Sequence, residues 1–270
     1  MVLAVLFTVG SSILILPAGM AHAAKQDAWI AATAALAGGL LLALFFHAVS
    51  ARYPGKNLVE IAEQSLGKWC GGAVALLYFA YFFILSALVL RNIGDFITTQ
   101  VLPNTPIQFI HTLFLVAVIM GIRNGIEVFT RTAEIFFPWV LFFFVTMAAL
   151  LPPKFKPGNV SPILGYGMKP ILHAALPVVG TPYMELVVFL MILPYVSTPK
   201  KSRSAFLAGV AIGGSMLVVI ALLSTLVLGP ELTARQMYPS FSLAKKISIG
   251  SFLERLEVIM AGIWFITIYF

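Results

Sequence analysis

The stretch Val178-Val179-Gly180-Thr181-Pro182-Tyr183-Met184-Glu185 interrupts the otherwise apolar segment 170–196. Proline removes a backbone donor and its ring clashes with the preceding turn, whereas glycine tolerates an opened backbone. We therefore expect two half-helices that meet inside this segment. In a membrane, such irregular backbone is tolerated only where it is buried in protein or lines a cavity, so the break predicts a ligand site.

The composition predicts a membrane protein. Hydrophobic residues make up 60% of the 270 residues, and charged residues only 10%, which lies far outside the composition of soluble globular proteins. Apolar runs of about 18 or more residues can cross the hydrocarbon core, and the chain holds about eight such runs. We expect an all-α, multi-pass protein whose main surroundings are the lipid bilayer.

The charged and reactive residues exclude several classes of function. The net charge is +7, but the 17 Lys and Arg residues are scattered over short loops, which argues against nucleic acid as a partner. Cys70 is the sole cysteine and the four histidines are far apart in sequence, so we expect no disulfide and no metal site. We expect no cofactor and no enzyme activity, because no nucleophile with a base and no nucleotide-binding loop is present.

The first apolar segment, residues 1–22, also contains an interruption, at Gly10-Ser11-Ser12. It ends in Ala21-His22-Ala23, a pattern that a signal peptide could carry at its cleavage site. A signal peptide would have a basic residue ahead of an uninterrupted apolar region, and this segment has neither. We therefore favour a second broken helix, which starts so abruptly that we expect upstream residues to be missing.

The two breaks predict an inverted five-plus-five repeat, because four continuous helices separate them. We expect one integral membrane domain, 1–270, with a first repeat at 1–151, a long loop at 152–170 and an incomplete second repeat at 170–270. A polar connection is expected at 125–131 and an amphipathic interfacial helix within 51–69. Transmembrane helices are expected at about 1–22, 29–50, 70–99, 107–122, 133–151, 171–196, 204–229 and 252–270.

Both breaks offer groups that can bind a small zwitterion. Gly10, Ser11 and Ser12, together with Gly180 and Thr181, would present free backbone groups and hydroxyls to an amino and a carboxylate group. Close helix packing is the alternative interpretation of these small residues.

Four further residues are candidates for the same site. Glu185 is a carboxylate inside the membrane, so it is either functional or a favourable neighbour of the half-helix dipole after Pro182, worth about 0.3–1 kcal/mol. Tyr81 and Leu85 lie four residues apart and can share one helix face, although Tyr81 could equally be a packing residue. Thr267, in the last helix, is the matching hydroxyl.

Arg91 and Asp95 can pair on one helix face, either as an outer gate or as an interfacial ion pair.

Seven motifs together resemble the spore germination B-subunit family. They are Tyr53-Pro54-Gly55-Lys56-Asn57-Leu58, Gly67-Lys68-Trp69, Asn104-Thr105-Pro106, Gly125-Ile126-Glu127 with Arg131, Tyr183-Met184-Glu185, Tyr238-Pro239-Ser240 and Phe252-Leu253-Glu254-Arg255-Leu256-Glu257. These B subunits are permease-like membrane subunits of germinant receptors and are similar to the amino acid/polyamine/organocation transporter superfamily. The resemblance implies a fold of ten helices, of which helices 9 and 10 are missing here, so we expect a truncated gene or fragment.

The resemblance also implies partners and a place in the cell. The partners would be a soluble-headed A subunit and a lipoprotein C subunit, and the place would be the inner spore membrane or the cell membrane. We expect a receptor subunit that binds a small amino-acid-like nutrient between helices 1, 3, 6 and 8. The alternatives are an amino acid transporter coupled to H⁺ or Na⁺, and a scaffold for the A and C subunits without its own ligand.

Overall fold

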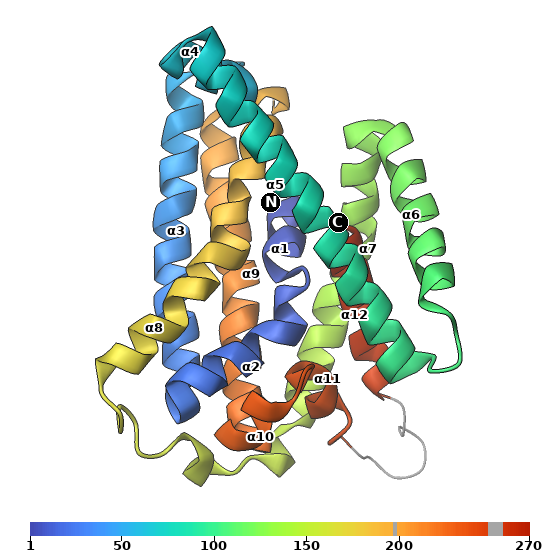
Figure 1. The fold of residues 1–270 in the computed structure, drawn as a ribbon. Coiled ribbons are helices and arrows are strands. Elements are labelled where there is room, and N and C mark those ends of the chain that lie inside the picture. Colours follow the sequence, from blue (N-terminus) through green and yellow to red (C-terminus); the bar gives the residue numbers. More distant parts are fainter. Residues whose placement is uncertain (197–198, 248–255) are drawn as a thin grey trace. The chain divides into compact units, whose positions relative to one another are not determined.

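The computed structural model describes residues 1–196, 199–247 and 256–270, and every regular element in these ranges is a helix (Figure 1). The predicted all-α class is therefore confirmed. Thr198 and the motif residues Phe252 to Arg255 lie outside the described residues. The helices are α1 Val2–Val9, α2 Ser12–Ala24, η1 Lys25–Asp27, α3 Ala28–Arg52, α4 Leu58–Leu66, α5 Lys68–Phe96, η2 Ile97–Val101, α6 Ile107–Arg123, α7 Gly125–Leu150, η3 Pro152–Lys154, η4 Pro157–Val160, α8 Met168–Val178, η5 Val179–Tyr183, η6 Met184–Met191, η7 Leu193–Tyr195, α9 Pro199–Leu228, α10 Pro230–Arg235, α11 Pro239–Ala244 and α12 Leu256–Tyr269.

Five helical segments of the described chain are long and apolar enough to cross a membrane. They are Ser12–Arg52, Lys68–Val101, Gly125–Leu150, Met168–Met191 and Ser202–Leu228. The apolar helix Ile107–Arg123 is shorter. These segments make the chain a multi-pass membrane protein. The predicted count of about eight transmembrane helices and the inverted repeat with its boundaries at 151 and 170 stay predictions.

The expected polar connection at 125–131 is wrong, because α7 begins at Gly125 and continues to Leu150. Gly125 has φ 82°, a left-handed conformation that lets the chain turn within one residue after Asn124. Glu127 and Arg131 then stand four residues apart, a spacing that a helix accommodates on one face. Their polarity therefore marks a helix end rather than a loop.

The described chain forms two compact units. The first contains residues 1–42, 130–185 and 207–270, and the second contains residues 43–129 and 186–206. In the first unit, α2 packs against α8, α10 and α11, while α1 packs against α12 and η5. In the second unit, α5 packs against α4 and α6.

Glycines of α3 and α9 allow close helix contacts around Tyr183 in the first unit. Tyr183 is 1% exposed. A Cβ atom on Gly39 would lie 2.3 Å from Cδ1 of its ring, and one on Gly214 of α9 would lie 2.6 Å from its hydroxyl. A Cβ atom on Gly38 would lie 3.1 Å from Val179. Small residues of this kind let helix backbones approach in membranes, and here they enclose the second break.

We expect the substitution Gly39→Ala to lower the thermal stability of the purified protein in detergent. The added methyl group would overlap the buried ring of Tyr183, and overpacking of this kind costs about 1–3 kcal/mol. The measurement is the midpoint of thermal unfolding followed by circular dichroism. Gly72→Ala is the matched control, because a Cβ atom on this α5 glycine meets nothing within 4 Å. Equal midpoints for the two variants would contradict the packing role of Gly39.

Candidate functional site

The first break lies where the sequence predicts it, between α1 and α2 (Figure 1). Gly10 has φ 31° and ψ −135°, and its N–H donates to Leu6 O at 2.8 Å, which closes the last turn of α1. A Cβ atom at this position would lie 3.0 Å from Phe7 O, in a backbone conformation that side chains disfavour. Ser11 precedes α2, and Ser12 is its first residue and is buried.

Hydroxyl groups from distant parts of the chain reach backbone oxygens at this break and in the helix after it. Thr267 Oγ1 on α12 is within hydrogen-bonding distance of two carbonyl oxygens, Gly10 O at 3.2 Å and Trp264 O at 3.1 Å. Ser240 Oγ on α11 donates to Ile13 O inside α2, whose helical partner would be the N–H that Pro17 lacks. Both side chains are buried. Because an unpaired carbonyl is costly away from water, Thr267 stabilises the opened backbone at Gly10 and Ser240 stabilises the proline position in α2.

The second break also lies where the sequence predicts it. α8 ends at Val178, and a wide π turn, η5, follows at Val179–Tyr183. Thr181 within this turn has φ −128° and ψ 114°, which is extended backbone, and the peptide bond from Thr181 to Pro182 is cis. The chain continues in the 3₁₀ helix η6 rather than in the expected α-helix. Gly180 lies in open space, since a Cβ atom there would meet nothing within 4 Å.

The two breaks are neighbours in the first unit, because α1 packs against η5. The helix before Gly10 thus lies against the turn that holds Gly180 and Thr181, and Thr267 contacts Gly10 itself. Glu185 follows the second break and is 8% exposed, so its carboxyl group is largely removed from the surface. The arrangement offers hydroxyls, carbonyls and helix-terminal N–H groups, which can bind a small polar molecule.

Two predicted site residues lie in the other unit. Tyr81 and Leu85 belong to α5, where the ring of Tyr81 packs edge-on against Phe82 with centroids 5.3 Å apart. Tyr81 is exposed and Leu85 is half-buried. Their place near the breaks stays a prediction.

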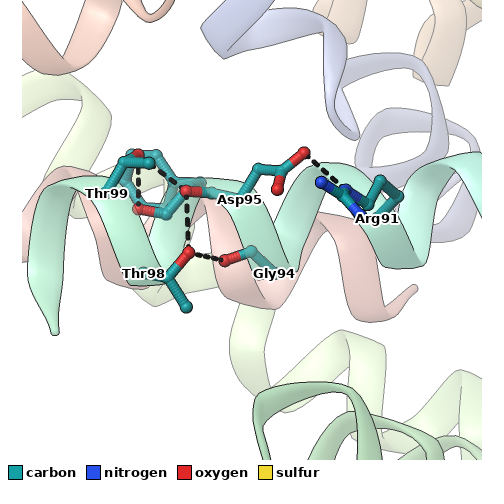
Figure 2. A network of polar contacts seen from close by, with 6 residues as sticks. Arg91, Gly94, Asp95, Thr98 and Thr99 are labelled. Carbon is teal, nitrogen blue, oxygen red and sulfur yellow. Dashed lines mark hydrogen bonds and ion pairs between the residues drawn. The ribbon is translucent and has the colours of Figure 1, made fainter. Parts of the chain in front are cut away.

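The predicted pair on α5 is confirmed. Arg91 Nε donates to Asp95 Oδ2 at 2.8 Å, and Figure 2 shows the contact along one helix face. Thr98 donates to Gly94 O at 2.9 Å and Thr99 to Asp95 O at 2.6 Å, so the whole network belongs to one helical segment. The side chains of Arg91 and Asp95 are 65% and 27% exposed. An exposed pair within one helix joins no second helix, which favours the interfacial ion pair over the gate.

Sequence reasoning missed Ser240 as a contributor to the first break. Ser240 stands in the motif Tyr238-Pro239-Ser240, but no neighbouring residue indicates that its hydroxyl contacts Ile13. The same motif places Tyr238 against Trp264 of α12, with ring centroids 6.0 Å apart. Proline at the first position of α11 is the available signal, since it predicts a helix start in an apparent loop. Across the described residues, no group of three or more His, Cys, Asp or Glu could hold a metal ion.

Comparison with known proteins identifies relatives along the whole chain. The profile of the spore permease family, described as "Spore germination protein", matches residues 1–270. Spore germination protein KB of Bacillus subtilis (strain 168) is 31% identical over 99% of this chain and 74% of its own length. Spore germination protein YndE of the same organism is 23% identical over 97% of this chain and 73% of its own length. Spore germination protein GerLB of Bacillus cereus is 27% identical over 90% of this chain and 66% of its own length. A match along the full chain together with 31% identity to one relative means that this multi-pass membrane protein belongs to the spore permease family of spore germination proteins.

Proposed function

We propose that the chain is a membrane subunit of a spore nutrient germinant receptor and binds a small amino-acid-like germinant at the paired helix breaks. The observation that carries the proposal is the first break, where Gly10 opens the helix and the hydroxyl of Thr267 on α12 donates to its carbonyl oxygen. Membership of the spore germination family supports the biological process, and the chemistry of the break supports the class of ligand.

A free amino acid is complementary to these groups. The first turn of α2 has N–H groups that the helix leaves without internal partners, and such a terminus attracts a carboxylate. The carbonyl oxygens at the two breaks attract an ammonium group. Gly180 leaves room beside η5, and Thr181 adds a hydroxyl there. Glu185 completes the proposed site and provides negative charge near the second break.

The proposal includes receptor partners. We propose an A subunit and a C subunit as the proteins that transmit ligand binding, and the inner spore membrane or the cell membrane as the location. A scaffold without its own ligand is the competing role. The open space at Gly180 in the second break favours a binding subunit over such a scaffold.

A secondary transporter that couples amino acid uptake to H⁺ or Na⁺ is the second candidate function. One observation favours it: Thr267 Oγ1 and Gly10 O lie 3.2 Å apart on two different helices, and oxygen atoms at an unwound helix can coordinate a cation. The buried carboxyl group of Glu185 is the corresponding candidate for H⁺.

Substitution of Thr267 tests the binding site. Thr267→Val keeps the shape but removes the donor to Gly10 O, and a buried acceptor left unpaired costs about 1–3 kcal/mol. We expect roughly tenfold more nutrient to be needed for half-maximal germination, measured as loss of optical density of spores exposed to each standard amino acid. Thr267→Ser keeps the donor and should respond like the wild type.

Thr98→Val is the matched control for a lost hydroxyl, because Thr98 donates to Gly94 O within its own helical segment. It should leave the nutrient response unchanged. A Thr267→Val protein that is made at normal levels and responds like the wild type would sink the proposed site.

Gly10→Ala tests the need for the opened backbone. Its Cβ atom would be strained at φ 31° and would lie 3.0 Å from Phe7 O, so the break has to rearrange. We expect the germination response to fall at least as far as in Thr267→Val, at equal protein level on immunoblots of spore membranes. Gly19→Ala in α2 is the control, because a Cβ atom there meets nothing within 4 Å. Loss of response in both variants alike would point to a general defect in α2 instead.

Uptake by liposomes separates the receptor from the transporter. With the full-length protein reconstituted and an inward gradient of H⁺ or Na⁺ imposed, a receptor subunit should accumulate no labelled alanine above protein-free liposomes. Gradient-dependent accumulation that Thr267→Val abolishes would establish the transporter instead.

A further inference from the structure

The connection between α3 and α5 is more ordered than an exposed turn between two membrane helices requires. Asn57 and Glu60 form a capping box at the start of α4, with Glu60 N–H donating to Asn57 Oδ1 at 3.0 Å and Asn57 N–H donating to Glu60 Oε2 at 2.9 Å. Ser65 Oγ donates to the hydroxyl of Tyr53 at 3.0 Å, and Lys56 Nζ donates to Gln64 Oε1. These contacts fix the turn 53–57 to both ends of α4.

Backbone contact fixes α4 against the first turns of α5. Gly67 has φ 81° and turns the chain between the two helices. Gly71 is buried, and a Cβ atom on it would lie 2.4 Å from Glu63 Cα, so the helices touch backbone to backbone. α4 therefore cannot rotate about its axis without separating from α5, and its side chains keep a constant direction relative to α5.

An open pocket of about 680 Å³ lies between this turn, α4 and the start of α5. Its lining includes two ammonium groups, from Lys56 and Lys68, and two carboxylates, from Glu60 and Glu63. Glu60 is used by the capping box and Lys56 by Gln64. Within the part of the chain that the structure describes, neither the carboxylate of Glu63 nor the ammonium group of Lys68 makes a hydrogen bond or an ion pair. One cation and one anion in the same pocket are thus available to a ligand.

The pocket lies at the boundary between hydrocarbon and water. α4 connects the membrane segments Ser12–Arg52 and Lys68–Val101, so it lies where both segments end. Trp69, next to the pocket residue Lys68, is 92% exposed, and Leu66 on the last turn of α4 is also exposed. Tryptophan is enriched at membrane interfaces, and an apolar flank beside a charged pocket is typical of a segment that lies in the headgroup layer.

We propose that this pocket binds the headgroup of a phospholipid that carries both a phosphate and a primary amine. Lys68 pairs with the phosphate, Glu63 accepts from the amine, and the acyl chains lie against Leu66 and Trp69. The balance of charge argues for this class, because two carboxylates in the lining disfavour a purely anionic headgroup while an amine makes them complementary. The exposed Trp69 argues for a lipid over a water-soluble phosphate. This site lies in the second compact unit and does not depend on germinant binding.

Native mass spectrometry of the full chain released from detergent tests the site. The protein is titrated with dioleoylphosphatidylethanolamine, with dioleoylphosphatidylglycerol and with dioleoylphosphatidylcholine. We expect saturable binding of one molecule of the ethanolamine lipid, and weaker binding of the choline lipid, which has no amine N–H. Lys68→Gln and Glu63→Gln should each weaken ethanolamine-lipid binding about five- to tenfold, since each removes one charge-assisted contact. Lys154→Gln, which removes an exposed lysine from η3, should leave it unchanged.

Charge selectivity provides the sharper readout. Glu63→Gln should narrow the preference for the ethanolamine lipid over the glycerol lipid, because it removes the negative charge that attracts the amine and repels an anionic headgroup. All three variants alter exposed side chains, so their thermal midpoints should match the wild type and show that folding is intact.

Three results would overturn the proposal. The first is equal binding of all three lipids with no effect of Glu63→Gln. The second is displacement of the ethanolamine lipid by glycerophosphoethanolamine at equal concentration, since a soluble headgroup would then suffice. The third is unchanged lipid binding in Lys68→Gln and Glu63→Gln together with loss of a co-purifying receptor subunit, which would make this surface a protein interface.

Discussion

The packing of the first unit depends on one constraint, which is that an opened backbone inside a membrane needs hydrogen-bond partners for its oxygen atoms. The hydrogen bond from Thr267 to the carbonyl oxygen of Gly10 meets this constraint. A backbone oxygen that leaves its helix inside the hydrocarbon has no water to bond to, and an unpaired one costs several kcal/mol. The partner here is 257 positions along the chain, in α12, and a second hydroxyl 227 positions from Ile13, Ser240 of α11, serves the carbonyl oxygen that Pro17 leaves free in α2. Both hydrogen bonds require the helix contacts that the structure shows, of α1 with α12 and of α2 with α11.

The second break meets the same constraint in a different way. Its π turn is enclosed by glycine contacts in which the ring of Tyr183 lies against Gly39 and its hydroxyl against Gly214. The ring occupies the space that larger side chains on α3 and α9 would otherwise fill. The turn is therefore held by van der Waals packing rather than by hydroxyl donors. This explains why Gly39 and Gly214 occur inside helices that are themselves continuous.

The sequence predicted the features that depend on local chemistry. Gly10 and the Gly180 to Pro182 run break their helices where glycine and proline require it, and Arg91 pairs with Asp95 because four residues make one turn. The sequence-based prediction was wrong at 125–131, where polar residues were interpreted as a loop, and after Pro182, where an α-helix was expected and a 3₁₀ helix follows.

In the candidate site, the sequence pointed to Thr267 but not to Ser240, since the partner of Ser240 lies 227 residues away. No local pattern encodes that distance, because only packing of α11 on α2 creates it. Tyr81 and Leu85 also show what a local pattern leaves open. Their spacing predicts that they share one face of a helix, but it does not predict which other part of the chain lies against that face.

The two breaks differ in how easily a ligand could contact their backbone oxygen atoms. A carbonyl oxygen has two lone pairs, so it can accept from a hydroxyl and from an ammonium group at once, and the bond to the ammonium group is charge-assisted. At the first break Gly10 O can therefore accept from a small amine while Thr267 keeps its hydrogen bond. At the second break the buried ring of Tyr183 fills the space beside Gly39 of α3 and Gly214 of α9, and moving it would leave a void. Under the proposed function the first break is accordingly the part that contacts the ligand, and the packing around Tyr183 holds the second break in place.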